Sequence, residues 1–171
     1  MKKPNIENLD ELVSNLIKEL SQCFHGANYF VDFIAKPISL DNKYHIEELF
    51  KPFVTSKPSL IKGLNSYPCD GLNQKDYKRD GLMTINIQEA KTTLKKLIID
   101  EELSQGRKIN KKAFERLNKL WQLISHYVSF NESKIYFYDN FRGMGIFWSY
   151  SLLIVDEQSK CAFFLGAGGW D

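Results

Sequence analysis

The sequence lacks the features that mark secreted and membrane proteins. Its only cysteines, Cys23, Cys69 and Cys161, are odd in number and far apart, whereas disulfide frameworks use even numbers of closely spaced cysteines. No window approaches the ~20 consecutive apolar residues of a membrane span. The acids Glu7 and Asp10 fall where a signal peptide needs an apolar stretch. These absences predict a cytoplasmic protein without a membrane partner.

Metal-binding patterns and an excess of charge are also missing. The chain has 23 basic and 21 acidic residues, for a net charge of +2, which by itself indicates neither a nucleic-acid nor a membrane partner. The histidines His25, His45 and His126 form no pair at helical spacing, and no Cys-x-x-Cys occurs. The acids within 70–80 lack EF-hand spacing. We therefore expect no metal and no cofactor, and we expect a nucleic-acid partner to be absent.

What is present is the pattern of a mixed helical and stranded protein. A length of 171 residues suits one domain, 1–171. Apolar residues spaced by three and four predict amphipathic helices, and these cover residues 6–22, 88–104 and 111–129, with a shorter helix over 42–50. The inward stripe of the 111–129 helix is expected to contain Phe114, Leu117, Leu120, Trp121, Ile124 and Val128.

Strands are predicted from alternation and from runs of β-branched and aromatic residues. They cover 28–36 (ended by Pro37), 82–87, 134–139, 146–155 and 160–165. Short connections favour antiparallel neighbours, both for the last strands and for the two central helices around Gly106. The order of elements predicts an α+β fold: an antiparallel sheet of about four to five strands, with an N-terminal helix and a central helical hairpin packed on it.

Aromatic residues gather at the C-terminal end of the chain. Residues 127–171 contain 12 of the 23 aromatics. The strand 146–155 is apolar on both faces, which indicates either a central strand covered on both sides or one face exposed to a partner. Because aromatic residues and arginine dominate binding energy, the candidate partner-binding residues are Tyr138, Asp139, Arg142, Trp148 and Trp170.

Two further segments have competing interpretations. The run 166–169 is glycine-rich but precedes no helix, so we predict a sharp turn that packs Trp170 back onto the domain, not a phosphate-binding loop. The basic run 107–119 can bind phosphates. It can equally be a solvated face that pairs with the acids 100–102.

In overall layout the chain resembles small bacterial immunity proteins. The likeness is carried by its modest length, its N-terminal amphipathic helix and the closing run from Leu153-Ile154-Val155-Asp156 to Cys161-Ala162-Phe163-Phe164-Leu165. That resemblance implies tight binding of a cognate toxin and no catalysis. The slightly basic charge departs from the acidic character of many nuclease inhibitors. The resulting hypothesis is a toxin-neutralising protein that is not an enzyme.

Two alternatives stay open. The first is an enzyme acting on a small molecule or nucleotide, with residues 54–80 as a lid and His25 or His126 as the acid–base group. The second is an RNA-binding domain, in which the basic helix contacts phosphates and the aromatics of the sheet stack on bases.

Overall fold

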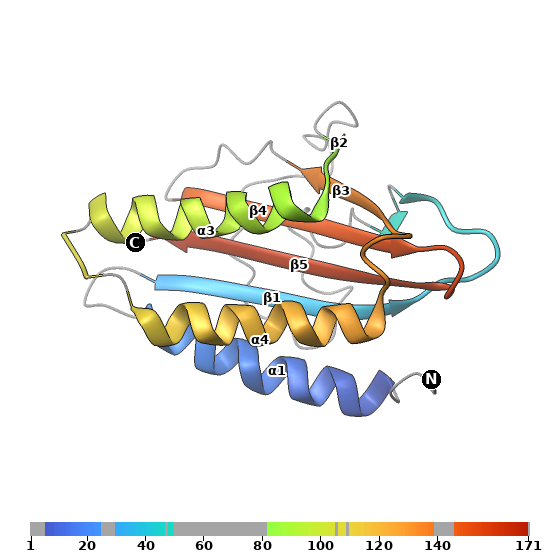
Figure 1. The fold of residues 1–171 in the computed structure, drawn as a ribbon, viewed down its shortest axis with the longest axis horizontal. Helices are drawn as coiled ribbons and strands as arrows, with labels where there is room; N and C mark the ends of the chain where they lie inside the picture. The colour runs from blue at the N-terminus through green and yellow to red at the C-terminus, as the bar shows by residue number, and fades with distance from the viewer. Residues whose placement is uncertain are drawn as a thin grey trace.

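The computed structural model describes residues 6–24, 30–46, 48–49, 82–104, 106–108, 110–138 and 146–170. Its helices are α1 (Ile6–Gln22), α3 (Ile87–Ser104) and α4 (Lys111–Tyr127). Its strands are β1 (Phe30–Ser39), β2 (Leu82–Thr84), β3 (Lys134–Tyr138), β4 (Ile146–Asp156) and β5 (Cys161–Trp170), as Figure 1 shows. The α+β prediction, with its N-terminal helix and helical hairpin, is confirmed.

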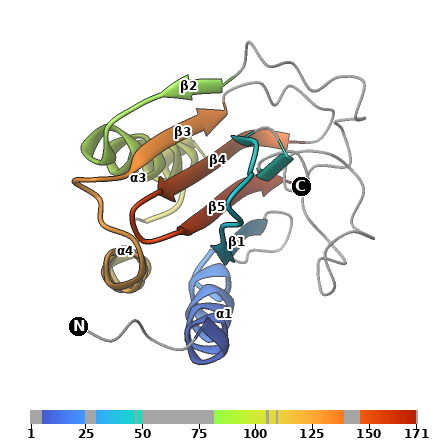
Figure 2. The same cartoon turned by 90° about the vertical axis from the view of Figure 1, so that its right-hand side faces the viewer.

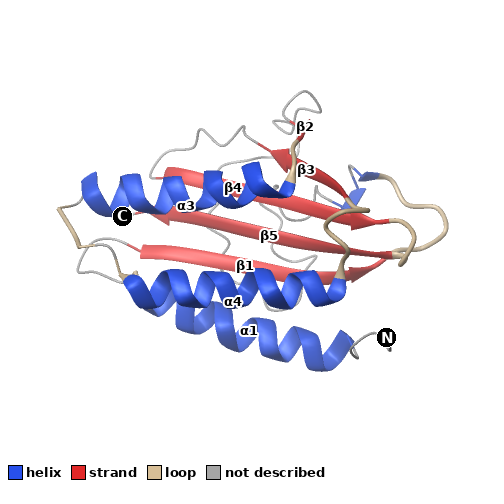
Figure 3. Cartoon of the chain, in the orientation of Figure 1, coloured by secondary structure: helices blue, strands red, loops and turns tan. Residues whose placement is uncertain are grey.

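The five strands form one antiparallel sheet in the order β1-β5-β4-β3-β2 (Figure 3). All three helices lie on one face of this sheet, and the segment 40–49 crosses the opposite face (Figure 2). Within that segment the Leu49 amide donates to the His45 carbonyl at 3.1 Å, which is one turn of the predicted 42–50 helix.

The core has one layer on each side of the sheet. Tyr150, Leu152 and Ile154 of β4 belong to the layer beneath the helices, whereas Leu153 and Val155 belong to the opposite layer. All five side chains are completely buried. Successive residues of a strand point to opposite faces, so residues 150–155 form a central strand covered on both sides. The alternative of an exposed face is wrong for this part of β4.

The prediction that Pro37 ends the first strand is wrong. β1 continues to Ser39, and Pro37 is paired with Phe163. β1 is an edge strand, and proline is tolerated there because the missing N–H can face away from the ladder.

The glycine-rich run 166–169 is a strand and not the predicted turn. Gly166, Gly168 and Gly169 continue β5 and pair with both β1 and β4. Among the glycines that the structure describes, Gly106 alone has a positive φ, so the run uses ordinary extended backbone. Glycine is permitted in a turn, but it does not require one.

Candidate functional site

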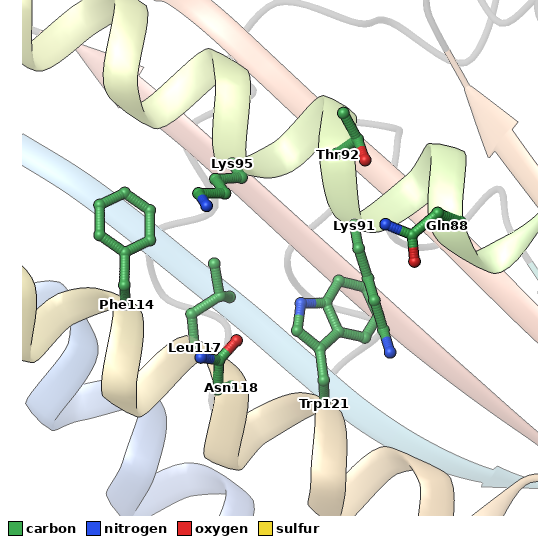
Figure 4. Close-up of a pocket in the computed structure, with 8 residues that line it drawn as sticks. All are labelled: Gln88, Lys91, Thr92, Lys95, Phe114, Leu117, Asn118 and Trp121. Atoms are coloured by element: carbon green, nitrogen blue, oxygen red, sulfur yellow. The ribbon is translucent and has the colours of Figure 1, made fainter.

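A groove separates α3 from α4 on the helical side of the sheet (Figure 4). It consists of two adjoining hollows of about 360 and 440 Å³, which share Lys91, Asn118 and Trp121. The side chains of Leu117 and Trp121 are buried and form its floor. Its other lining residues are Gln88, Thr92, Lys95, Phe114, Gln122, Ser125 and Phe130.

Two lysine ammonium groups of α3 lie over aromatic rings of the groove. The Lys91 Nζ is 5.7 Å from the Trp121 ring centroid and 5.0 Å from that of Phe130. The Lys95 Nζ is 5.7 Å from the Phe114 centroid. Such contacts attract a cation to the ring face and hold its methylene stem against apolar surface. The rings therefore orient both ammonium groups toward the groove.

Among the residues that the structure describes, no acidic side chain compensates the charge of the groove. Its lining contains no aspartate or glutamate. Neither Lys91 nor Lys95 forms an ion pair with any residue in the described ranges. The side chains of Gln88, Asn118 and Gln122 are exposed and can both donate and accept hydrogen bonds. The groove therefore offers two cations and several amide groups to an incoming molecule.

The position of α3 is fixed at its start and along its buried face. The Asn86 side chain accepts from the Glu89 amide, and Glu89 accepts from the Asn86 amide, both at 2.9 Å. This reciprocal pair is a capping box, which begins the helix. Ala90 is fully buried, and its carbonyl accepts a 3.0 Å hydrogen bond from the Tyr150 hydroxyl of β4. Burial raises the pKa of Tyr150 well above its usual range, so the hydroxyl stays protonated and able to donate.

The end of α3 is equally well defined. The Gly106 amide donates to the Leu103 carbonyl at 3.0 Å, and the Arg107 amide donates to the Glu102 carbonyl at 2.8 Å. These two bonds, with Gly106 at φ 67°, make a Schellman motif that closes the helix. The Arg107 guanidinium also donates to the Phe24 carbonyl at 3.1 Å. The turn between the two helices is thus tied to the end of α1.

α4 is positioned by its cap and by its contacts with α1. The Asn110 side chain caps the helix by accepting from the Lys112 amide at 3.0 Å. Arg116 donates to the Glu19 carboxylate of α1 at 3.0 Å, so part of the basic run pairs with α1. α4 packs against α1 and β5, whereas α3 packs against β4. The groove is the space between α4 and α3 on this face of the sheet.

A separate hollow of about 420 Å³ lies between α1 and α4. Leu12 at its edge is 55% exposed. Glu19 contributes a negative charge, Lys119 a positive charge and His126 a titratable ring. Compared with the α3–α4 groove, this hollow has no single sign of charge.

The predicted partner-binding residues have varied outcomes. Tyr138 is completely buried in the layer opposite the helices, so its side chain presents no surface to a partner, and this part of the prediction is corrected. Asp139 and Arg142 lie outside the described residues. The backbones of Trp148 and Trp170 belong to β4 and β5, but their side chains are not among those described. For these four residues the prediction stays a prediction.

The two histidines with described side chains lie apart from the α3–α4 groove. His45 is exposed. His126 is exposed on α4, with its Nδ1 2.6 Å from the Gln122 carbonyl. His25 and the predicted lid 54–80 lie outside the described residues. No group of three or more metal-ligating side chains occurs within the described part of the chain. The buried thiol of Cys161 donates to the Tyr127 carbonyl at 3.3 Å, as expected of a core cysteine.

The RNA-binding alternative depended on the aromatics of the sheet. Among the described side chains of the sheet, Phe163, Phe164 and Tyr150 are completely buried and Phe137 is 6% exposed, whereas Tyr136 is half-buried. Base stacking needs an open ring face, and the four buried rings offer none. None of the helices in the described ranges is long and apolar enough to cross a membrane.

The sequence matches no protein-family model and no curated protein sequence. The fold, however, is similar to that of citrus MAF1 in two crystal forms. The TM-scores are 0.53 and 0.52, the sequence identities are 11% and 10%, and each match covers 91% of this chain and 98% of the citrus protein. At this level of identity the likeness is one of fold.

This comparison corrects the functional hypothesis. The prediction of a toxin-neutralising immunity protein is wrong, because the fold is shared with MAF1, a protein of different function. The immunity resemblance rested on length and layout, which many small α+β proteins share.

The groove itself was not predicted from the sequence. Lys91 and Lys95 are four residues apart and so share one face of their helix. Phe114 and Trp121 are seven apart and share a face of the next helix. Phe114 was expected in the buried stripe, but this side chain is only half-buried because it lines the groove. The signals available were a basic face on one helix and an aromatic face on the next.

Proposed function

We propose that this chain is a MAF1-like protein that acts by binding a macromolecular partner and not by catalysis. The observation that carries the proposal is the extent of the fold match, which covers 91% of this chain and 98% of citrus MAF1. A match of that extent compares nearly the full length of both chains, whereas a shared motif would compare only a part.

The composition of the groove supports binding as its role. Its lining consists of lysine, amide, hydroxyl and apolar side chains. General acid–base catalysis most often uses histidine or carboxylate groups near the reacting atoms, and the lining contains neither. Two lysines beside solvent provide charge of one sign, which suits electrostatic recognition of a partner.

Comparing the binding partners of the two proteins tests the proposal. The tagged chain, expressed in the cells it comes from, and tagged citrus MAF1, expressed in citrus cells, would each be captured after mild crosslinking. We expect corresponding assemblies from the two baits. A Leu94→Asp variant places a charge at a completely buried position and serves as an unfolded bait. Proteins that this variant also captures bind exposed core residues and are subtracted from both sets. Two sets with no corresponding member would contradict the proposal.

A further inference from the structure

The α3–α4 groove has a length, a charge and a hydrogen-bonding pattern that together specify a ligand. From Phe114 to Ser125 the α4 wall extends for about 16 Å at 1.5 Å per residue. An extended peptide of about five residues has the same length. The walls are formed by two helices that are each anchored elsewhere, so the groove does not need to form on binding.

The two lysines place separate positive charges along the groove. Lys91 and Lys95 are one helical turn apart on α3, but their ammonium groups extend toward different rings, that of Lys91 toward Trp121 and that of Lys95 toward Phe114 (Figure 4). Alternate side chains of an extended peptide point the same way and are about 6.6 Å apart. Carboxylates two or four residues apart on one extended segment can therefore each be directed at one ammonium group.

The opposite wall supplies partners for a peptide backbone. The exposed amides of Asn118 and Gln122 lie one turn apart on α4 and line the groove. A side-chain amide can donate to a backbone carbonyl and accept from a backbone N–H at once. We propose that the groove binds an extended acidic segment of a protein partner, with carboxylates on Lys91 and Lys95 and backbone on Asn118 and Gln122.

A nucleic acid fits the same groove less well. Trp121 is only 5% exposed, and Phe114 and Trp121 already have lysine ammonium groups over their rings. Stacking of bases requires those faces. Two ammonium groups also provide few phosphate contacts, and nucleic-acid affinity depends on their number.

The test is an NMR titration of the ¹⁵N-labelled full chain with defined probes. The first probe is a short peptide with glutamate at alternate positions and serine elsewhere; the second replaces each glutamate with glutamine. We expect the glutamate peptide alone to shift the Trp121 indole and the Asn118 and Gln122 side-chain amide signals. We expect its affinity to fall as salt is raised, because exposed ion pairs are screened.

Charge reversal distinguishes binding at the groove from attraction to the net positive charge of the protein. Lys91→Glu with Lys95→Glu should weaken the glutamate peptide about tenfold or more, since two attractions become repulsions. The matched control is Lys96→Glu with Lys111→Glu, which reverses the same number of charges at two exposed lysines outside the groove lining, and it should change affinity far less. Equal loss in both variants, or no preference for the glutamate peptide, overturns the proposal. Tighter binding of oligothymidylate than of the glutamate peptide, lost in the double variant, also overturns it.

This inference rests on the proposed binding function, but the two can fail separately. The peptide titration needs no cellular partner. If the double variant still captures the same assemblies as the wild-type chain, the groove is not the docking site and the MAF1-like function stands. If the peptide binds as expected while the two baits capture unrelated assemblies, the groove stands and the MAF1-like function fails.

Discussion

The hydroxyl of Tyr150 links the sheet to the helix that carries both groove lysines. It donates to the Ala90 carbonyl at 3.0 Å, and the side chain is completely buried. Its ring also packs against Phe137 with centroids 5.2 Å apart. Tyr150→Phe removes the hydrogen bond and keeps the ring, so it isolates the contribution of the hydroxyl.

We expect this change to lower the free energy of unfolding by about 1 kcal/mol. A buried hydrogen bond contributes about 0.5–1.5 kcal/mol net. The Ala90 carbonyl lies within α3 and remains part of the hydrogen-bond ladder of the helix. Loss of the Tyr150 hydroxyl as a second partner therefore adds little further destabilisation. With a urea m-value of about 2 kcal/mol/M, the midpoint would fall by about 0.5 M.

Urea unfolding followed by circular dichroism measures this shift. The matched control is Tyr44→Phe, because the Tyr44 hydroxyl donates to the Glu157 carboxylate at 2.9 Å in an exposed position, where water can replace the bond; its midpoint should move less. A Tyr150→Phe variant as stable as the wild type, or more stable, would refute the argument that this hydroxyl holds α3 on the sheet.

Three further predictions concern buried polar groups and the helix end. Asp156 is buried and accepts from the Ser129 amide at 3.0 Å and the Ser159 amide at 2.8 Å; Asp156→Ala should lower the free energy of unfolding by about 2–4 kcal/mol in urea, and Asp156→Asn by less. Gly106→Ala should destabilise by about 1 kcal/mol in a thermal melt, although the added Cβ would meet no atom within 4 Å, because φ is positive. Burial raises the pKa of Tyr127 to about 12. The stabilising contribution of the protonated Tyr127 hydroxyl is therefore complete below pH 10 and falls by about 1.4 kcal/mol per pH unit between pH 10 and 12. When the free energy of unfolding is measured against pH, Tyr127→Phe should lose less stability over this range than the wild type.

Periodicity was sufficient to predict the helices. α1 has the bounds expected from its apolar spacing, and α4 begins at Lys111, the residue at which the 111–129 helix was predicted to start. These signals are local, because a cap or a turn involves only neighbouring residues. Local rules failed at Pro37 and at the glycines of β5 because their outcome depends on a strand's place in the sheet. An edge strand tolerates proline, and a strand between two partners stays extended despite its glycines.

The site depended on relations that the sequence does not contain. Aromatics of β4 and β5 looked numerous enough to be exposed, but the segment 40–49 covers the second face of the sheet. The groove lies between α4, which packs against α1 and β5, and α3, which packs against β4, and these contacts join residues that are distant in sequence. A basic face on one helix and an aromatic face on the next can be found from the sequence, but no pattern within either helix indicates that the two faces line one open groove.

The place of β5 determines when the protein can finish folding. Among the described strands, β1 pairs with β5 alone, and β5 also pairs with β4 along its whole length. On the ribosome, β1 ends at Ser39, about 120 residues before β5 begins at Cys161, whereas β4 comes immediately before β5. Until β5 is made, the edge of β1 that will pair with it has free amide and carbonyl groups, and such edges recruit other chains. A nascent chain of this protein is expected to depend on chaperones, or on α1 shielding β1, until β5 pairs with β1.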